Sequence, residues 1–276
     1  MEKPPHVPEL PEVETTRRGI APWLEGRTPA SVVIHNPSLR WPITPELPER
    51  LTAGPIGSVE RRGKYLLLNN PLGTALVHLG MSGSLRVASP EEPRRKHDHV
   101  ELGLDGDRVL RFNDPRRFGS WLWTSDWQQH PLLAPLGPEP LEASFTGDRL
   151  YEGSRGRRAS VKAFIMDAKT VVGVGNIYAS EALFRAGIHP GRPAGSVGRQ
   201  RYRRLAEAIR EILGNAIAVG GTTLRDFTDS SGNPGYFRQS LTVYGRAGEP
   251  CKVCGTPLRD RVIAQRSTVF CTQCQR

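Results

Sequence analysis

The chain has 276 residues, of which 37% are hydrophobic and 24% charged, and its formal net charge at pH 7 is +10. This composition excludes a disordered chain, and no apolar run approaches the roughly 20 residues of a membrane span. Residues 1–10 contain no long apolar stretch, so we expect no secretory signal and a cytoplasmic protein. The positive charge favours partners rich in phosphate, although a generic basic surface would carry it as well.

The first half of the chain is predicted to form one helix followed by short strands, and the total length allows two modest domains. Apolar residues recur at helical spacing over residues 12–24. Glycine and proline then separate short apolar runs, which predict strands at residues 32–34, 65–68, 75–79, 99–104 and 109–113. This pattern is typical of a β-sandwich or barrel that carries a helix.

The second half is predicted to be mainly helical and follows a connection rich in proline and leucine at residues 130–140. We predict helices at residues 177–186 and 201–219, the second with its apolar residues on one face. Residues 220–237 are rich in glycine, threonine, aspartate and serine and predict a long loop. The Gly-Val-Gly-Asn sequence at 173–176 suits an anion at a helix start, but it lacks the third glycine of a dinucleotide fingerprint. We therefore expect no nucleotide cofactor.

The cysteines form two C-x-x-C pairs at the end of the chain, and they are Cys251, Cys254, Cys271 and Cys274. Such pairs are typical of a four-thiolate zinc site, whereas disulfide frameworks spread their cysteines along a secreted chain. We therefore expect one structural Zn²⁺ in a hairpin-rich tail. Such a tail cannot bury enough apolar surface to fold alone, so the metal would supply its stability.

Several segments place unusual residues at the ends of predicted elements. Residues 8–14, Pro-Glu-Leu-Pro-Glu-Val-Glu, crowd prolines and glutamates at the front of a helix, where helix chemistry alone is a sufficient explanation. Lys64 stands at the mouth of a strand, Met81 lies in a Gly-Met-Ser-Gly turn, and Phe118 follows two arginines. Methionine and phenylalanine usually lie in the core. On loops beside arginines, however, they are the apolar side chains that part stacked bases.

Taken in chain order, these segments are similar to the bacterial formamidopyrimidine-DNA glycosylase family. The resemblance runs from about Pro8 to Arg276 and rests on Pro-Glu-Leu-Pro-Glu-Val-Glu, Arg-Gly-Lys-Tyr-Leu, His-Leu-Gly-Met-Ser-Gly, Asn-Asp-Pro-Arg-Arg-Phe-Gly, Val-Gly-Asn-Ile-Tyr-Ala-Ser-Glu and the cysteine hairpin. It implies an α+β fold, in which an N-terminal β-sandwich with a leading helix faces a helical domain. That second domain would contain a helix–two-turn–helix and a zinc-binding β-hairpin, with damaged double-stranded DNA in the cleft.

The resemblance also sets expected domain limits. A catalytic β-sandwich would span residues 8–132, a linker 133–150, a helical DNA-binding domain with the lesion loop 151–240, and a zinc finger 241–276. Because one chain provides both walls of the cleft, we expect a monomer. Its substrate would associate it with the nucleoid.

The implied activity is that of a bifunctional glycosylase and AP lyase, which excises 8-oxoguanine and formamidopyrimidines in base excision repair. Pro8 would attack the sugar C1′ through its own nitrogen, because a terminal amine has a pKa of roughly 8, against roughly 10.4 for lysine. From this Schiff base, β- and then δ-elimination would cut the sugar–phosphate backbone. Glu9 would act as acid/base at the sugar, Lys64 would assist the β-elimination and Arg266 the δ-elimination. Lys64 and Arg266 are alternatively phosphate anchors.

The resemblance also implies roles for further residues of this sequence that stand at matching positions of the family motifs. The side chains that would fill the gap left by the flipped nucleotide, which we call the wedge, are Met81, Arg116 and Phe118. The positions that would contact DNA are His78, His97, Arg157 and Asn176. The positions of the damaged-base pocket and its closing loop, 222–236, are Glu181, Thr222, Thr223 and Tyr236. Arg157 also fits a solvated basic loop, and Glu181 a helix acid paired with an arginine.

The front of the chain departs from the family, which needs its proline as the first residue. Here residues 1–7 precede Pro8, and a proline inside a chain has a tertiary amide nitrogen that cannot form a Schiff base. We hypothesise that translation starts at Val7, read from a GUG codon as methionine, which is then trimmed.

Two alternatives remain open at this point. An endonuclease VIII-like glycosylase for oxidised pyrimidines would have a similar proline and zinc hairpin, although Pro-Arg-Arg-Phe-Gly and the loop 222–236 favour the purine enzyme. A non-catalytic zinc-containing DNA-binding protein would keep the same basic surface, with Glu9 and Lys64 as mere surface charges.

Overall fold

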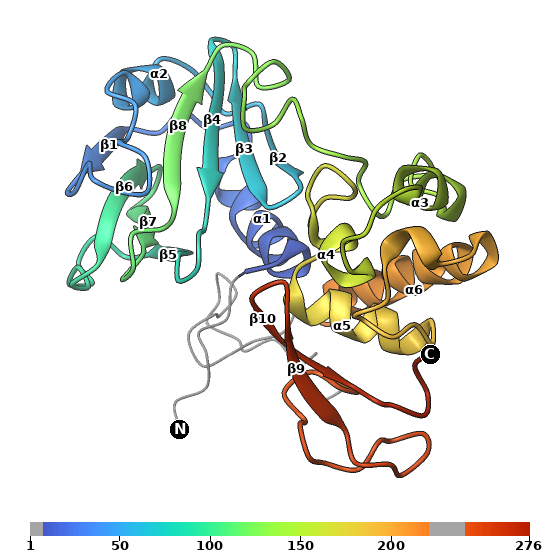
Figure 1. Ribbon diagram of the computed structural model, residues 1–276. Coiled ribbons are helices and arrows are strands. Elements are labelled where there is room, and N and C mark those ends of the chain that lie inside the picture. The colour runs from blue at the N-terminus through green and yellow to red at the C-terminus, as the bar shows by residue number, and fades with distance from the viewer. Residues whose placement is uncertain (1–7, 221–240) are drawn as a thin grey trace. The chain divides into compact units, whose positions relative to one another are not determined.

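The computed structural model describes residues 8–220 and 241–276, which fall into two compact units (Figure 1). Among these residues, the first unit holds 8–134 and Gly220, and the second holds 135–219 and 241–276. In the described parts of the chain, no helix is long and apolar enough to cross a membrane.

The first unit is a sandwich of two four-stranded antiparallel sheets. One sheet has the order β2-β3-β4-β8 and consists of β2 (Ser58–Arg62), β3 (Tyr65–Asn70), β4 (Gly73–His78) and β8 (Ser120–Thr124). The other has the order β1-β6-β7-β5 and consists of β1 (Ser31–Ile34), β5 (Ser84–Ala88), β6 (Asp98–Leu104) and β7 (Arg108–Asn113). Apolar side chains of both sheets form one buried cluster, which includes Leu66, Val77, Leu102 and Phe112. The predicted β-sandwich is confirmed.

Two helices close the two open edges of the sandwich. α1 (Leu10–Leu24) contacts β2 and β5, which are outer strands of the two sheets, and α2 (Leu47–Thr52) contacts β1 and β8 at the opposite edges (Figure 1). α1 buries Val13, Ile20 and Leu24, the helical spacing that predicted this element. α1 is thereby fixed to the sheet edges.

The strands that the sequence pattern did not predict are β2, β5 and β8, and all are outer strands of their sheets. An outer strand has one neighbour only and keeps fewer buried positions. β2 buries Val59 alone, and β5 carries Arg86 in its middle, where its guanidinium bonds Asp98 of β6 at 2.6 Å. The alternation of apolar and polar residues is correspondingly weak.

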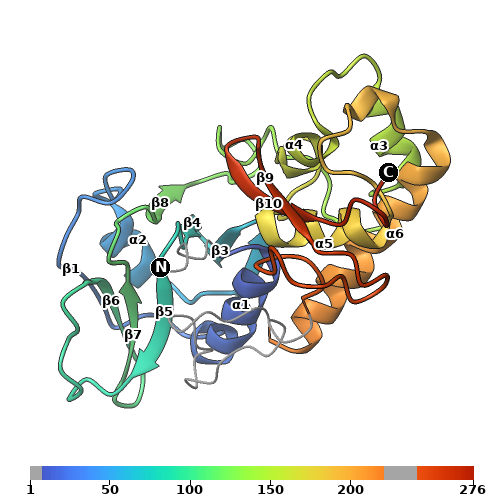
Figure 2. The same cartoon turned by 60° about the horizontal axis from the view of Figure 1, so that its bottom comes forward.

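The second unit packs helices around α6 and carries the C-terminal hairpin (Figure 2). Its elements are α3 (Gly147–Ser154), α4 (Val161–Met166), α5 (Asn176–Arg185), the 3₁₀ turn η1 (Ala194–Ser196), α6 (Arg199–Ala218), β9 (Arg259–Ile263) and β10 (Arg266–Phe270). α6 lies against α3 and α5, and the shared core includes Tyr178, Leu205 and Ile209. The hairpin has its own small cluster, in which Leu258 and Val269 pack beside cysteines.

Candidate active site and metal centre

Pro8 and Glu9 occupy the buried front of α1. Glu9 is the residue at the N-terminal cap of the helix and is 3% exposed, and Pro8 before it is also buried. The backbone N–H of Glu9 donates to Glu12 Oε2 at 3.0 Å, which is one half of a capping box. The second glutamate of this motif, Glu12, therefore fixes the backbone that carries the predicted catalytic pair.

Glu14, one turn further along α1, is held as an anion by arginines. Arg17 and Arg18 each lie 2.9 Å from its Oε1, and Arg61 of β2 lies 3.2 Å from its Oε2. Burial raises the pKa of Glu14, but the hydrogen bonds from Arg17 and Arg18 and the charges of Arg17 and Arg61 outweigh it and keep the pKa below its ordinary value. Glu14 thus ties α1 to the sheet as an ionised carboxylate.

Lys64 and His78 lie close together at one end of the β2-β3-β4 sheet. Lys64 is in the turn between β2 and β3, and His78 ends β4 opposite Tyr65, whose ring centroid is 4.8 Å from that of His78. Burial, and then the charges of Lys64 and Arg40, lower the pKa of His78 to about 4. Its Nδ1 accepts from Gly80 N at 2.9 Å, so the neutral ring carries its proton on Nε2. His78 can donate to an anion at pH 7 without being charged.

The wedge side chains lie on two turns that touch through their backbones. We call residues 79–83, after β4, the Met81 turn, and residues 114–119, after β7, the Phe118 turn. A Cβ on Gly80 would lie 2.4 Å from Gly119 N and 2.4 Å from Phe118 C, so only glycine fits there. Phe118 is 41% exposed, and the Arg116 guanidinium lies 5.0 Å from the centre of its ring. The structure therefore brings the three wedge positions together.

His97 lies beside the same turns. It precedes β6, is half-buried, and accepts a hydrogen bond on its carbonyl oxygen from Asp114 N at 3.0 Å. Its ring is 6.2 Å from that of His99, whose Nε2 bonds the Asp114 carbonyl at 2.8 Å. His97 thus joins His78 and the wedge on one part of the first unit.

In the second unit the structure brings Asn176 and Arg266 together. Arg266 is exposed and begins β10, and the next residue, Ser267, accepts a hydrogen bond from Asn176 Nδ2 at 3.1 Å. The buried Lys162 of α4 donates from Nζ to Thr268 Oγ1 at 2.7 Å. Two helices therefore hold the strand that presents Arg266.

Glu181 on α5 binds backbone rather than an arginine. Its Oε1 accepts from Val243 N at 2.9 Å and Tyr244 N at 2.8 Å, and its Oε2 accepts from Thr242 N at 2.8 Å. The side chain is buried. This carboxylate fixes the segment 242–244, which follows the predicted lesion loop in the chain.

The remaining predicted residues are not joined to these groups. Arg157 is exposed in the loop after α3, and its backbone bonds Ser154 and Gly195 at 3.0 and 2.9 Å. The predicted loop residues Thr222, Thr223 and Tyr236 lie outside the described residues.

The four cysteines converge at the base of the β9–β10 hairpin. Their sulfur atoms all lie within 4.8 Å of one another, with 3.9 Å between Cys251 and Cys274 and 3.5 Å between Cys254 and Cys271. Tetrahedral Zn²⁺ with bonds of about 2.3 Å places its sulfurs about 3.8 Å apart, whereas a disulfide needs about 2.05 Å. The cysteine geometry fits a metal and excludes bridges.

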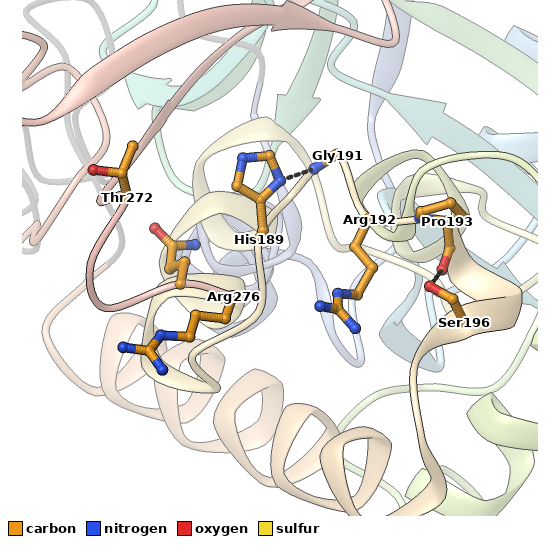
Figure 3. A pocket seen from close by; sticks show the side chains of 8 residues that line it. His189, Gly191, Arg192, Pro193, Ser196, Thr272 and Arg276 are labelled. Carbon is orange, nitrogen blue, oxygen red and sulfur yellow. Dashed lines mark hydrogen bonds between the residues drawn. The ribbon is translucent and has the colours of Figure 1, made fainter.

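A pocket of about 490 Å³ lies in the second unit, between the loop after α5 and the end of the chain (Figure 3). Figure 3 shows His189 with Arg192 and Arg276 on either side of it. Burial, and then the charges of Arg261 and Arg192, lower the pKa of His189. The described residues that line this pocket include none of the site residues predicted from the sequence.

Comparison with known proteins identifies the family in each part of the chain. Residues 7–121 match the formamidopyrimidine-DNA glycosylase N-terminal domain, residues 136–228 its H2TH domain, and residues 248–276 the zinc finger found in FPG and IleRS. The chain belongs to the formamidopyrimidine-DNA glycosylase family. The helix–two-turn–helix domain and the resemblance seen in the sequence are confirmed.

Relatives of this family match over almost the whole chain. The formamidopyrimidine-DNA glycosylase of Marinobacter nauticus is 60% identical over 270 residues, which cover 98% of this chain and 100% of the relative. A Lactococcus lactis FPG variant in complex with DNA containing Fapy-dG has a TM-score of 0.91 at 34% identity, covering 98% of this chain and 100% of that one. The L. lactis Fpg in complex with DNA containing an abasic site has a TM-score of 0.90 at 34% identity, covering 97% and 99%.

The match of residues 248–276 to a zinc finger identifies the metal of the cysteine cluster as zinc. Cys251, Cys254, Cys271 and Cys274 form the structural Zn²⁺ site of the C-terminal zinc finger, as predicted. Zinc with four thiolate ligands has no open coordination position, so it stabilises the hairpin and takes no part in the reaction.

Three polar residues of this glycosylase were not singled out by sequence reasoning. They are Ser82 and Asp114 at the wedge turns and Lys162 behind β10. The only available signals were an aspartate before a proline, which is ordinary turn chemistry, and a lone lysine in the apolar run Val-Lys-Ala-Phe-Ile-Met.

Proposed function

We propose that this protein is a bifunctional DNA glycosylase and AP lyase of base excision repair, which excises 8-oxoguanine and formamidopyrimidines from damaged duplex DNA. The observation that carries the proposal is the nearly full-length match to formamidopyrimidine-DNA glycosylases, including structures that hold lesion-containing DNA. A substrate in the chromosome places the protein in the cytoplasm with the nucleoid. We expect it to act as a monomer, with the domain limits that the family resemblance implies.

In the proposed reaction the nitrogen of Pro8 attacks C1′ of the damaged nucleotide. The glycosidic bond breaks and the base leaves with the bonding electrons and a proton. Opening of the sugar at O4′, with Glu9 as the acid, gives a Schiff base between Pro8 and C1′. The capping box at the front of α1 supports these roles, because it fixes the backbone between the two reacting groups.

Strand cleavage follows from the acidity of the iminium. Loss of a C2′ proton expels the 3′ phosphate, and loss of a C4′ proton then expels the 5′ phosphate. We assign Lys64 to the first step and Arg266 to the second, with both also anchoring phosphate. The proximity of Lys64 to the neutral His78 supports a phosphate site there, because His78 can donate one hydrogen bond beside the lysine charge.

We also propose that the other predicted residues serve binding and lesion recognition. The exposed Phe118 with its stacked Arg116 suits insertion into a base stack, and His97, Arg157 and Asn176 would contact the DNA backbone. Glu181 would serve the lesion pocket indirectly, by fixing the segment 242–244 after the loop that contains Thr222, Thr223 and Tyr236.

This mechanism requires a free secondary amine at Pro8. The match to the family's N-terminal domain begins at residue 7, which supports an active chain that starts at Pro8. The intact mass of the natively produced protein tests this proposal. A chain that keeps its first seven residues and still forms the covalent intermediate would overturn the assigned nucleophile.

Borohydride trapping tests the proposed function directly. Protein beginning at Pro8 should become covalently linked to a duplex with 8-oxoguanine opposite cytosine, and Pro8→Gly should remove most of this trapping. Undiminished trapping by the variant would point to another amine, such as that of Lys64. A duplex with an oxidised pyrimidine serves as the second substrate, and preference for it would favour the endonuclease VIII-like alternative. No trapping on either would favour the non-catalytic one.

A further inference from the structure

The Asp114 side chain is fully buried at the base of the Phe118 turn. Its Oδ2 accepts a hydrogen bond from Gly119 N at 2.7 Å, and its Oδ1 accepts one from Ser82 Oγ at 2.6 Å. The same Ser82 Oγ accepts from Arg116 N at 3.1 Å. The Asp114 carboxylate and the Ser82 hydroxyl therefore join the Met81 turn to the Phe118 turn and link the two ends of the Phe118 turn.

The backbone of Asp114 holds further parts of the same region. Its N–H donates to His97 O at 3.0 Å, and its carbonyl accepts from Arg117 N at 3.2 Å and bonds His99 Nε2 at 2.8 Å. Arg117 has a φ of +57°, which is an unfavourable conformation for a residue other than glycine. The bonds around Asp114 select this conformation and thereby set the direction in which Phe118 leaves the turn.

Close packing adds to these hydrogen bonds. A Cβ on Gly119 would lie 2.8 Å from His78 O and 3.0 Å from Asp114 Oδ2. Gly119 is thus packed against both the end of β4 and the Asp114 carboxylate, and a residue with a side chain does not fit there. The predicted DNA-contacting residues His78 and His97 and the three wedge residues Met81, Arg116 and Phe118 each lie on a segment that this network contacts.

We propose that Asp114, acting with Ser82, is a positioning residue for base eversion. It locks the Met81 turn and the Phe118 turn into one rigid body, so that the wedge is in place before the base leaves the stack. This inference rests on the proposed function. Unstacking is unfavourable, and a wedge offsets it only if its own ordering has already occurred on folding. A mobile wedge would have to be ordered during eversion and would slow it.

Ser82→Ala is the sharpest test, because it removes the hydroxyl that links Asp114 Oδ1 and Arg116 N and leaves the wedge side chains intact. Asp114→Asn tests the carboxylate itself, and Ser82→Thr restores a hydroxyl. The matched control is Thr74→Val, which removes a hydroxyl that donates to Asn69 Oδ1 at 2.8 Å near the other end of β4. All variants are made in the full chain, and their melting temperatures are recorded.

Two substrates separate eversion from chemistry. We expect Ser82→Ala to lower the single-turnover rate of 8-oxoguanine excision about tenfold, and cleavage of a preformed abasic site less than about threefold, because no base has to be unstacked there. Ser82→Thr should recover most of the loss. Thr74→Val should keep both rates while lowering the melting temperature as Ser82→Ala does. In a Met81→Ala, Phe118→Ala background, Ser82→Ala should cause no further loss.

Other outcomes decide against the proposal. Equal losses of rate on the two substrates would show that Asp114 and Ser82 have a merely structural role. The same conclusion would follow if Ser82→Ala lowered the excision rate of the Met81→Ala, Phe118→Ala protein as much as it lowers that of the wild type. Unchanged excision by both Ser82→Ala and Asp114→Asn would overturn the inference outright. Failure of the wild-type protein on both substrates would count against the proposed function instead, so the two failures are distinguishable.

Discussion

His78 makes the stability of the first unit depend on pH. Burial, and then the charges of Lys64 and Arg40, lower the pKa of His78 from 6.5 to about 4 in the folded protein. As the pH falls below 6.5, the unfolded chain binds a proton that the folded chain refuses, so stability is lost until about pH 4. We expect the contribution of His78 to the free energy of unfolding to fall by about 2 kcal/mol between pH 7 and pH 5.

Urea unfolding of the wild type and of His78→Gln at the two pH values measures this contribution. Between pH 7 and pH 5 the free energy of unfolding of the variant should fall by about 2 kcal/mol less than that of the wild type. The other histidines whose pKa is lowered, His35, His130 and His189, are present in both proteins and cancel in the comparison. Parallel losses in the two proteins would show that His78 is protonated as readily in the folded chain as in the unfolded one.

Some residues predicted from the sequence have chemistry that is unusual for their position, whereas others, such as Arg157, were assigned only through the family motifs. A proline-glutamate pair at a helix front, a methionine in a glycine turn and paired cysteines all stand out without a structure. Asp114 does not, because its partners Ser82 and Gly119 are set by how two turns meet in space. Glu181 was singled out, but its backbone partners at 242–244 depend on a tertiary contact that no local pattern encodes.

Among the elements, α5 and the segment 242–244 are joined by the carboxylate of Glu181, which accepts three backbone N–H groups. Glu181→Gln keeps one oxygen and turns an amide NH₂ toward the remaining donors, so at least one buried N–H loses its acceptor. We expect the free energy of unfolding of the second unit to fall by about 1–3 kcal/mol. Circular dichroism during urea unfolding provides the measurement.

The matched control for this prediction is Glu211→Gln. Glu211 forms an exposed ion pair with Arg185, so the same substitution there should change the free energy of unfolding by less than about 1 kcal/mol. Equal effects of the two substitutions would argue against the backbone anchor. Activity adds a second readout: a pure anchor predicts that excision and abasic-site cleavage fall together, whereas direct contact with the lesion predicts a loss of excision alone.

The elements that the sequence predicts well are those with a strong apolar period. The predicted helix at 201–219 corresponds to α6 (Arg199–Ala218), and the predicted strand at 109–113 to β7 (Arg108–Asn113). β7 lies between β6 and β5 and buries most of its residues, whereas β5 and β2 at the sheet edges bury few and were missed. Edge strands such as these are held in the sheet by hydrogen bonds to their neighbour more than by a hydrophobic pattern of their own, so their sequence gives a weak signal.

Across the whole molecule, reporter residues are divided between the two units. All five tryptophans lie at positions 23–127, within the first unit, and all four cysteines lie after residue 250, within the second. Tryptophan fluorescence therefore reports on the β-sandwich alone, and the zinc site belongs to the unit that lacks this signal. Each unit also has its own apolar core, so the loss of one fold does not require the loss of the other.

Removal of zinc should abolish activity while leaving the β-sandwich folded. The hairpin core is small, with Val243, Leu258 and Val269 packed beside cysteines, so the metal is needed to hold it and to present Arg266. After chelation we expect loss of lesion-specific DNA binding and cleavage, with tryptophan emission unchanged because Trp121 stays buried in its own unit. Added Zn²⁺ should restore both functions and added Mg²⁺ should not, since thiolates are poor ligands for magnesium. A red shift in tryptophan emission on chelation would show instead that the two units unfold together. Cleavage by the zinc-free protein at the normal rate would show that neither Arg266 nor its hairpin is needed for the reaction.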